Sequence, residues 1–154
     1  MPLSYHHHRA AVIETEPQLD MFMKHSGEGI PLLFDAGHMA FAGGDVMRVI
    51  DKHHKRIAHV HTKDVRMDVI DKLDRTRESF LDAVVKGAFT VPGDGSLDFE
   101  AILQKLADHG YEGWFVVEAG QDPVKAPAKY AKIGYRALTK ALTKAGYKIE
   151  GQSS

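Results

Sequence analysis

The sequence contains no cysteine among its 154 residues. Disulfide bonds, zinc sites built from thiolates, and thiol nucleophiles are therefore excluded. The sequence also lacks an apolar run that approaches the roughly 20 residues of a membrane-spanning helix. Its amino terminus, MPLSYHHHRA, has neither the basic region nor the apolar stretch of a signal peptide. Together these absences predict a cytoplasmic protein with no membrane partner.

An excess of charge of either sign is missing as well. Twenty lysines and arginines oppose 21 aspartates and glutamates, which leaves a formal net charge of −1. Without a basic tail or stripe, a nucleic-acid partner is not expected. The hydrophobic share of 44% suits one globular domain with a core. Histidine is the unusual residue, because it occurs ten times and several copies lie in apolar segments.

Extended apolar segments alternate with helical patterns four times along the chain. Continuous apolar strands that are joined by helices indicate a parallel sheet covered by helices. The sequence therefore predicts an α/β fold. The predicted strands are LSYHHH (3–8), IPLLFDAGH (30–38), RIAHVHTKD (56–64) and EGWFVVEAGQD (112–122), and the predicted helices are 15–27, 43–55, 99–110 and 129–146.

Capping residues mark several helix boundaries. Thr15 and Gln18 have the spacing of a capping box, Asp45 is an N-cap candidate, and Gly110 suits a helix end. The stretch 65–98 reads as a long insertion, with a short helix at SFLDAVVKG (79–87) and a turn-rich segment, VPGDGSLD (91–98). Residues 147–154 are expected to be a frayed tail.

Each predicted strand ends in residues that can bind a metal or carry a proton. In parallel α/β folds the chemistry gathers at the carboxyl ends of the strands. The agreement of all four strands therefore predicts a site at that edge. The residues are His6, His7 and His8 on the first strand, Asp35 and His38 on the second, His61 and Lys63 on the third, and Glu118 on the fourth.

A divalent metal is the first interpretation of this pattern. Asp35, His61 and Glu118 offer oxygen and imidazole donors without sulfur, which suits Mn²⁺, Co²⁺, Mg²⁺, Fe²⁺ or Zn²⁺. Neighbouring strands lie about 4.8 Å apart, so donors at their ends can converge on one ion. His59 lies on the same side of its strand as His61, which is nearer the carboxyl end and is the better ligand.

Simpler readings compete with the metal. Asp35 alone suits a helix cap, His59 suits a packed, hydrogen-bonded core histidine, and the triple histidine suits a tag remnant, although Tyr5 continues the strand. GDG is commoner as a tight turn than as a phosphate cradle. Trp114 and Phe115 are expected in the core, and His25, His53, His54 and His109 at exposed helix ends.

Five segments carry a family resemblance. YHHH…VIET, LLFDAGHMAFAGGD, RIAHVHTKDVR, SFLDAVVKGAFTVPGDGSLDF and GWFVVEAGQDP resemble the inosose dehydratases, within the xylose-isomerase-like TIM-barrel superfamily of sugar isomerases, epimerases and dehydratases. The resemblance extends from about Ser4 to about Leu142. It implies dehydration of scyllo-inosose (2-keto-myo-inositol) in inositol catabolism. It also implies a divalent metal, Mn²⁺ or Co²⁺ before Mg²⁺, Zn²⁺ or Fe²⁺.

The resemblance also implies roles for individual residues. Asp35, His61 and Glu118 match three metal-ligand positions, and the fourth, usually a glutamate, aligns with about His6, with Glu14 as the alternative. Glu118 is the expected base, and His38 or Lys63 the expected acid. His8, His38 and Lys63 are the expected substrate contacts. Arg9 departs from the family, which tends to have methionine there.

Length sets the last expectation. A whole TIM barrel needs about 250 residues, so residues 1–146 are expected to form a carboxyl-terminal (βα)4 half barrel, with a tail at 147–154. Two sheet edges and an apolar inner face invite pairing, which predicts a homodimer or higher homo-oligomer. The alternatives to dehydration are a sugar or hydroxypyruvate isomerase or epimerase, and a catalytically inactive half barrel that binds metal or polyol.

Overall fold

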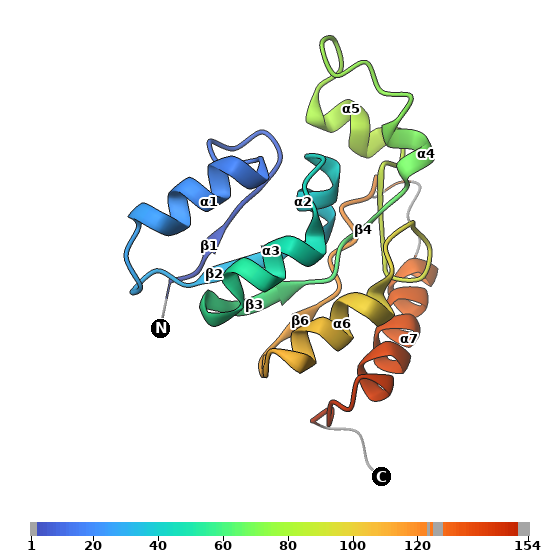
Figure 1. Ribbon diagram of the computed structural model, residues 1–154. Helices are drawn as coiled ribbons and strands as arrows, with labels where there is room; N and C mark the ends of the chain where they lie inside the picture. Colours follow the sequence, from blue (N-terminus) through green and yellow to red (C-terminus); the bar gives the residue numbers. More distant parts are fainter. Residues whose placement is uncertain (1–2, 123, 125–127, 151–154) are drawn as a thin grey trace.

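A four-stranded parallel sheet forms the centre of the molecule (Figure 1). The computed structural model describes residues 3–122, 124 and 128–150. The strands lie in the order β1-β2-β3-β6, and every neighbouring pair is parallel. The predicted α/β fold with a parallel sheet is thus confirmed. The strands are β1 (Tyr5–His6), β2 (Leu32–Asp35), β3 (Ile57–His61) and β6 (Phe115–Val116).

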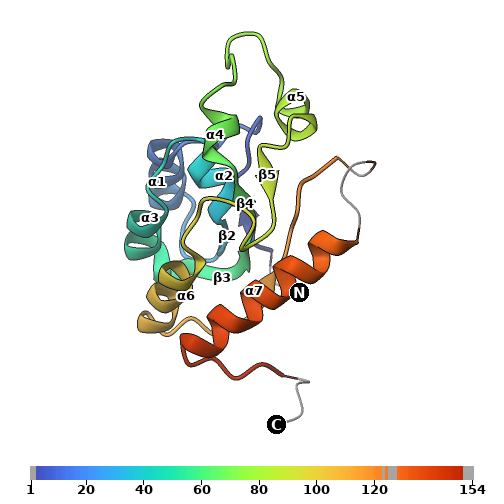
Figure 2. The ribbon, with the colours of Figure 1, turned by 90° about the vertical axis from the view of Figure 1, so that its right-hand side faces the viewer.

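Four helices pack along the sheet. Figure 2 shows α1, α3 and α6 side by side on one face, and α7 packs against α6. Leu32, Phe34 and Val60 point from the strands into the core between these layers and are fully or almost fully buried. The helices are α1 (Glu16–His25), α3 (Val46–His53), α6 (Phe99–Asp108) and α7 (Lys129–Lys144). No described helix is long and apolar enough to cross a membrane.

The predicted helix caps are present. The backbone N–H of Thr15 donates to Gln18 Oε1 over 2.9 Å, as a capping box requires. The Asp45 carboxylate accepts the Arg48 N–H at 3.0 Å. Gly110 has a φ of +71°, the left-handed conformation that ends α6. Local sequence therefore fixes where these helices begin and end.

Residues 65–98 form a small substructure beyond the carboxyl ends of the strands (Figure 1). Its short antiparallel ladder joins β4 (Asp64–Val65) to β5 (Phe89–Thr90). The predicted helix is present as α5 (Phe80–Val85), with Ser79 as N-cap. The ladder, α4 (Met67–Ile70), α2 (Ala36–Phe41) and the short 3₁₀ turn η1 (His54–Arg56) were not predicted. A second buried cluster that includes Phe41 and Phe89 holds this part to α2.

Several expectations about single residues are wrong. Trp114 was expected in the core but is 74% exposed. His53 was expected at an exposed helix end but is half-buried, with Nε2 at 2.7 Å from Asp20 Oδ1. Tyr147 and Ile149, expected in a frayed tail, pack against the core. Residues 151–154 of that predicted tail lie outside the described part of the chain.

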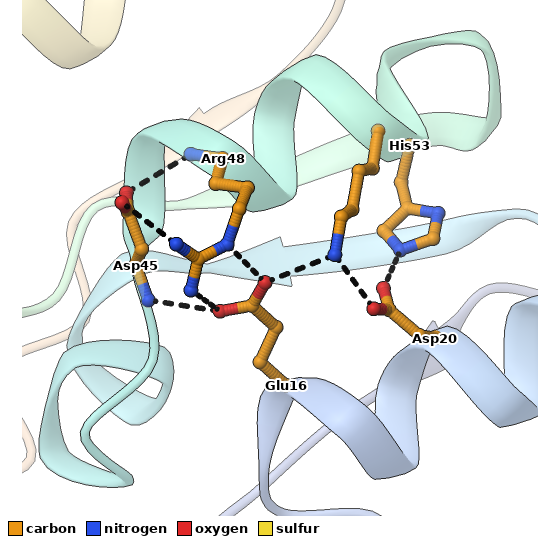
Figure 3. Close-up of polar contacts among 6 residues, drawn as sticks. Glu16, Asp20, Asp45, Arg48 and His53 are labelled. Carbon is orange, nitrogen blue, oxygen red and sulfur yellow. Dashed lines mark hydrogen bonds and ion pairs between the residues drawn. The ribbon is translucent and has the colours of Figure 1, made fainter.

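A network of charges fastens α1 to α3 (Figure 3). The buried Glu16 carboxylate accepts from Arg48 Nε at 2.6 Å and from Arg48 Nη2 at 2.7 Å. The N–H of Asp45 donates to Glu16 at 3.1 Å, and Lys52 bridges Glu16 and Asp20. The hydrogen bonds from Arg48 lower the pKa of Glu16 to about 2, although burial opposes them. Glu16 is therefore ionised in the folded state down to low pH.

We expect Glu16→Gln to destabilise the fold in a pH-dependent way. The folded-state pKa of Glu16 lies below its ordinary value of 4.5, so its contribution is full above pH 4.5 and is lost as the pH falls through about 2. Urea unfolding at pH 7 should show a loss of roughly 1–3 kcal/mol, as expected for hydrogen bonds to charged groups. The loss should shrink when the measurement is repeated at pH 3.5.

Glu100→Gln is the matched control. Glu100 pairs with Lys144 on the surface, where both side chains are well exposed. Such pairs contribute about 0–1 kcal/mol. An equal effect of the two substitutions, or a pH-independent effect of Glu16→Gln, would contradict the role given to the buried carboxylate.

Candidate metal centre

Four side chains converge at the carboxyl ends of the four parallel strands. His6 ends β1, Asp35 ends β2, His61 ends β3, and Glu118 follows β6. Asp35 stands opposite His61 in the register of the sheet. One donor atom from each side chain lies within 4.8 Å of all the others. The structure therefore brings together the four residues that the sequence suggested as ligands, and we call them the quartet.

Asp35 is the centre of the quartet. Its Oδ2 lies 3.4 Å from His6 Nε2 and 3.5 Å from His61 Nδ1. His61 Nδ1 in turn lies 2.6 Å from Glu118 Oε2. The donor set is thus two imidazole nitrogens and two carboxylate oxygens, all facing one point.

The same four atoms lack ordinary hydrogen bonds. His6 Nε2, Asp35 Oδ2, His61 Nδ1 and Glu118 Oε2 are buried and have no hydrogen-bond partner of acceptable geometry within the described residues. Buried polar atoms are nearly always satisfied. Within the described residues these four make ion-pair contacts with one another instead, so their convergence needs an explanation. Mixed imidazole and carboxylate donors suit a divalent ion of the first transition series or Mg²⁺. The residues present therefore fit a metal.

Asp35 serves the fold and the quartet with different oxygens. Its Oδ1 accepts the His38 N–H at 2.8 Å and caps α2, while Oδ2 faces the quartet. Asp35 can therefore cap α2 and serve as a metal ligand at the same time. Burial alone would raise the pKa of Asp35, but contacts with His6 and His61 hold it well below its usual range. Asp35 is a buried carboxylate at neutral pH.

His61 and Glu118 influence each other's charge. Burial lowers the pKa of His61, but the Asp35 and Glu118 carboxylates outweigh it and raise the pKa to about 9. Contact with His61, followed by contact with Lys63, lowers the pKa of Glu118 to about 2 against the effect of burial. Both carboxylates of the quartet are therefore ionised over the whole neutral range.

Lys63 and His38 adjoin the quartet. Lys63 is 2% exposed, and its Nζ lies 2.8 Å from His38 Nε2, 2.9 Å from Glu118 Oε1 and 3.9 Å from Asp35 Oδ2. Burial lowers the pKa of His38 to about 3, with Lys63 acting in the same direction and Asp35 against it. His38 is therefore a neutral imidazole at pH 7, beside a lysine that donates to Glu118.

Two further residues adjoin the quartet: His7, one of the strand-end histidines that the sequence marks, and Phe80, which the sequence does not mark. His7 is fully buried, and its Nε2 accepts the backbone N–H of Asp35 at 3.3 Å. Phe80, the first residue of α5, lies with its ring centroid 5.2 Å from that of His8, and the His8 ring centroid lies 3.7 Å from that of His38 with the two rings tilted. Sequence patterns mark α5 as a helix but contain no signal that folds it back onto the first strand.

Glu14 and His59 lie outside the quartet. Glu14, the alternative fourth ligand, binds the Arg9 guanidinium and accepts the Ala10 N–H at 3.1 Å. His59 faces the same side as His61, with ring centroids 5.4 Å apart, but it is half-buried on the open face of the sheet. The core position expected for His59 is therefore wrong.

The VPGDGSLD segment is a turn wrapped around a buried acid. Asp64 Oδ1 accepts the Val65 and Leu97 N–H groups at 2.8 and 3.0 Å. A Cβ added at Gly95 would lie 2.3 Å from the Asp64 carboxylate, so only glycine fits there. Because a carboxylate fills the loop, the turn reading is confirmed over a phosphate cradle.

Comparisons with known proteins place this geometry in a family. Residues 5–141 match the family described as xylose isomerase-like TIM barrel. The rhizopine catabolism protein MocC of Rhizobium meliloti is 49% identical over 148 residues, which cover 96% of this chain and 46% of that protein. The inosose dehydratase of Geobacillus thermodenitrificans is 48% identical over 133 residues, which cover 85% of this chain and 45% of that enzyme. The chain spans about half the length of the curated relatives it matches.

Solved structures agree on the fold. A crystal structure of the IOLI protein with a bound zinc atom has a TM-score of 0.66 and 15% identity, covering 95% of this chain and half of that one. The probable 3-DHS dehydratase AsbF of Bacillus anthracis has a TM-score of 0.65 and 19% identity, covering 93% of this chain and 49% of that one. The strand order, the quartet and the match over most of the sequence agree: this chain belongs to the xylose isomerase-like TIM barrel family, of which it forms about half a barrel.

Proposed function

We propose that this chain carries the metal centre and the proton-transfer groups for dehydration of scyllo-inosose. The observation that carries the proposal is the quartet of unsatisfied buried donors, with Lys63 hydrogen-bonded to one of its members. Sequence identity of 48% to an inosose dehydratase supports the substrate. The chain spans 45% of that enzyme, so the proposal concerns the groups that this half of the barrel carries.

His6, Asp35, His61 and Glu118 are the proposed metal ligands. Mn²⁺ or Co²⁺ is the proposed ion, ahead of Mg²⁺, Zn²⁺ or Fe²⁺; the IOLI structure, with its zinc atom, supports metal binding in this fold. A bound dication supplies Lewis-acid polarisation of the substrate ketone. The two ionised carboxylates offset the charge of a divalent ion, and carboxylate and imidazole donors suit such ions.

Glu118 is the proposed base. Its pKa of about 2 keeps it ionised, and its side chain is 37% exposed, so a substrate can reach it. Glu118 takes the proton from the carbon next to the ketone. The electrons of that C–H bond form a C=C bond to the next ring carbon, and the C–O bond to the hydroxyl on that next carbon breaks.

Lys63 is the proposed acid. Of the two candidates we favour Lys63, because His38 is a neutral imidazole at pH 7. The departing hydroxide takes a proton from the Lys63 ammonium and leaves as water. His38, 2.8 Å from Lys63, then orients the amine and contacts the substrate together with His8. Glu118 can return its proton to Lys63 over their 2.9 Å contact, which completes the cycle.

The open face of the sheet supports self-association. Leu33, His59 and Val116 point away from the helices and remain half-exposed. Phe34 and Val60, on the other face, are buried. Strands β1 and β6 each pair on one side only within the described residues. Parallel sheets are normally covered on both faces. We therefore propose that two copies cover each other's inner faces.

Removing a ligand should remove the metal. We expect His61→Ala and Glu118→Ala each to weaken Mn²⁺ or Co²⁺ binding by about 100-fold or more. Replacing a residue that only hydrogen-bonds to a metal ligand already costs about 10- to 100-fold in affinity, and these variants remove a ligand itself. Titration with Co²⁺, followed by visible absorption, measures the affinity. His59→Ala is the matched control, because His59 lies on the same strand and face but outside the quartet. Tight binding in both ligand variants would refute the assignment.

Lys63→Met should separate catalysis from metal binding. We expect the metal affinity to be nearly unchanged and the rate of scyllo-inosose dehydration to fall by about 100-fold or more, the contribution of a general acid. Lys24→Met, on an exposed part of α1, is the control. The same assay with ketoses tests isomerisation. A metal-loaded chain that converts neither substrate would favour the inactive half barrel.

Charge on the inner face should break the proposed pair. We expect sedimentation to show a species of about twice the 17.1 kDa chain mass. Leu33→Asp should convert it to a monomer, whereas Leu81→Asp, at an exposed position on α5, should not. A single monomeric species of the unchanged chain would contradict this arrangement.

A further inference from the structure

An aromatic wall stands beside the quartet. His8, His38 and Phe80 form it. The His8 and His38 ring centroids lie 3.7 Å apart with the two rings tilted by 43°, and the Phe80 centroid lies 5.2 Å from that of His8 and 5.9 Å from that of His38. The three residues come from the end of β1, from α2 and from α5, so segments far apart in the sequence build one surface.

The wall adjoins the proposed ligands. The His6 ring centroid lies 5.5 Å from the His8 centroid and 5.5 Å from the His38 centroid. His6 and Glu118 keep side-chain exposures of 26% and 37%, and His8 and Phe80 are half-exposed. A molecule that contacts the quartet from solvent therefore also meets the wall.

Phe80 is held in place independently of the quartet. Ser79 caps α5, and the Asp82 carboxylate accepts the Ser79 N–H at 2.8 Å. The Phe80 ring also packs 5.4 Å from that of Phe89, in the second buried cluster. Ligand sites are commonly lined by aromatic side chains beside a few convergent polar groups, and the fixed Phe80 ring beside the quartet fits that description.

We propose that this wall binds the C–H face of a cyclic polyol. When all hydroxyls of a cyclohexane ring are equatorial, both faces of the ring present only C–H groups, which pack on an aromatic surface. An open-chain polyol has no such face. Phe80 would thus set a preference for rings over open chains. The inference rests on the proposed function and assigns to Phe80 the selection of a ring substrate.

Two hexols without a ketone test the wall apart from catalysis. scyllo-Inositol is an all-equatorial ring, and sorbitol is an open chain with the same number of hydroxyls. Saturation transfer from the aromatic protons of the chain to polyol C–H protons, with affinities from titration, is measured in Mg²⁺-loaded and metal-free protein. We expect tighter binding of scyllo-inositol than of sorbitol, and transfer to the ring protons.

Substitutions then isolate the aromatic face. Phe80→Leu keeps an apolar residue against Phe89, and we expect it to weaken scyllo-inositol binding about three- to tenfold, with less than a twofold change for sorbitol. Phe80→Tyr, which keeps an aromatic ring, should bind scyllo-inositol as tightly as the unchanged chain. Leu81→Ala, at an exposed neighbouring position on α5, should leave the affinity for both polyols unchanged. Metal affinity should stay the same throughout.

The inference would be overturned if Phe80→Leu weakened the binding of both polyols equally, if it weakened neither, or if the unchanged chain bound neither polyol. Phe80 would then serve only to pack residues 65–98 against the rest of the fold. Failure of the proposed function has a different signature. If the chain binds no divalent metal but scyllo-inositol still binds through Phe80, the proposed role of Phe80 is supported and the proposed metal-dependent dehydration is refuted.

Discussion

The parallel register that sets Asp35 opposite His61 is the constraint on which the site depends. It brings a buried carboxylate to the point where the ends of β1, β3 and β6 meet. Because Asp35 also caps α2 with its other oxygen, the same side chain fixes the helix that carries His38. A slip of one residue in β2 would turn Asp35 toward the helices and bring Phe34 out of the core, so the hydrophobic pattern of the strand protects the site geometry.

Charge in the site is arranged so that a cation and a proton compete for the same donors. The Asp35 and Glu118 carboxylates that attract a dication also raise the pKa of His61 to about 9. Lys63 adds a second positive charge, anchored to Glu118 on the side away from His61. Binding of a metal therefore requires His61 to release its proton, whereas Lys63 can stay in place. This separation lets one residue, Glu118, face a metal with one oxygen and a proton donor with the other.

The sequence predicted the strands, the main helices and three quartet residues, Asp35, His61 and Glu118, because each depends on short-range patterns. The fourth ligand, His6, was implied by the family resemblance alone. Apolar runs define strands, caps define helix ends, and parallel connectivity brings the strand ends together. What it missed depends on long-range packing. The position of Phe80 over His8 is set by the second buried cluster, which joins residues from 41 to 89. Trp114 was assigned to the core by residue type alone, and a half barrel leaves part of its apolar surface uncovered.

Division of the barrel places all the proposed chemistry in one half. The quartet, Lys63 and His38 lie on four consecutive strand-helix units, so the donors need no residue from another half to converge. The inner face of the sheet is different, since Leu33 and Val116 remain half-exposed along it. A barrel interior is a packed core made from all of its strands. Donor geometry is therefore local to this half, whereas burial of its inner face depends on whatever surface covers the sheet.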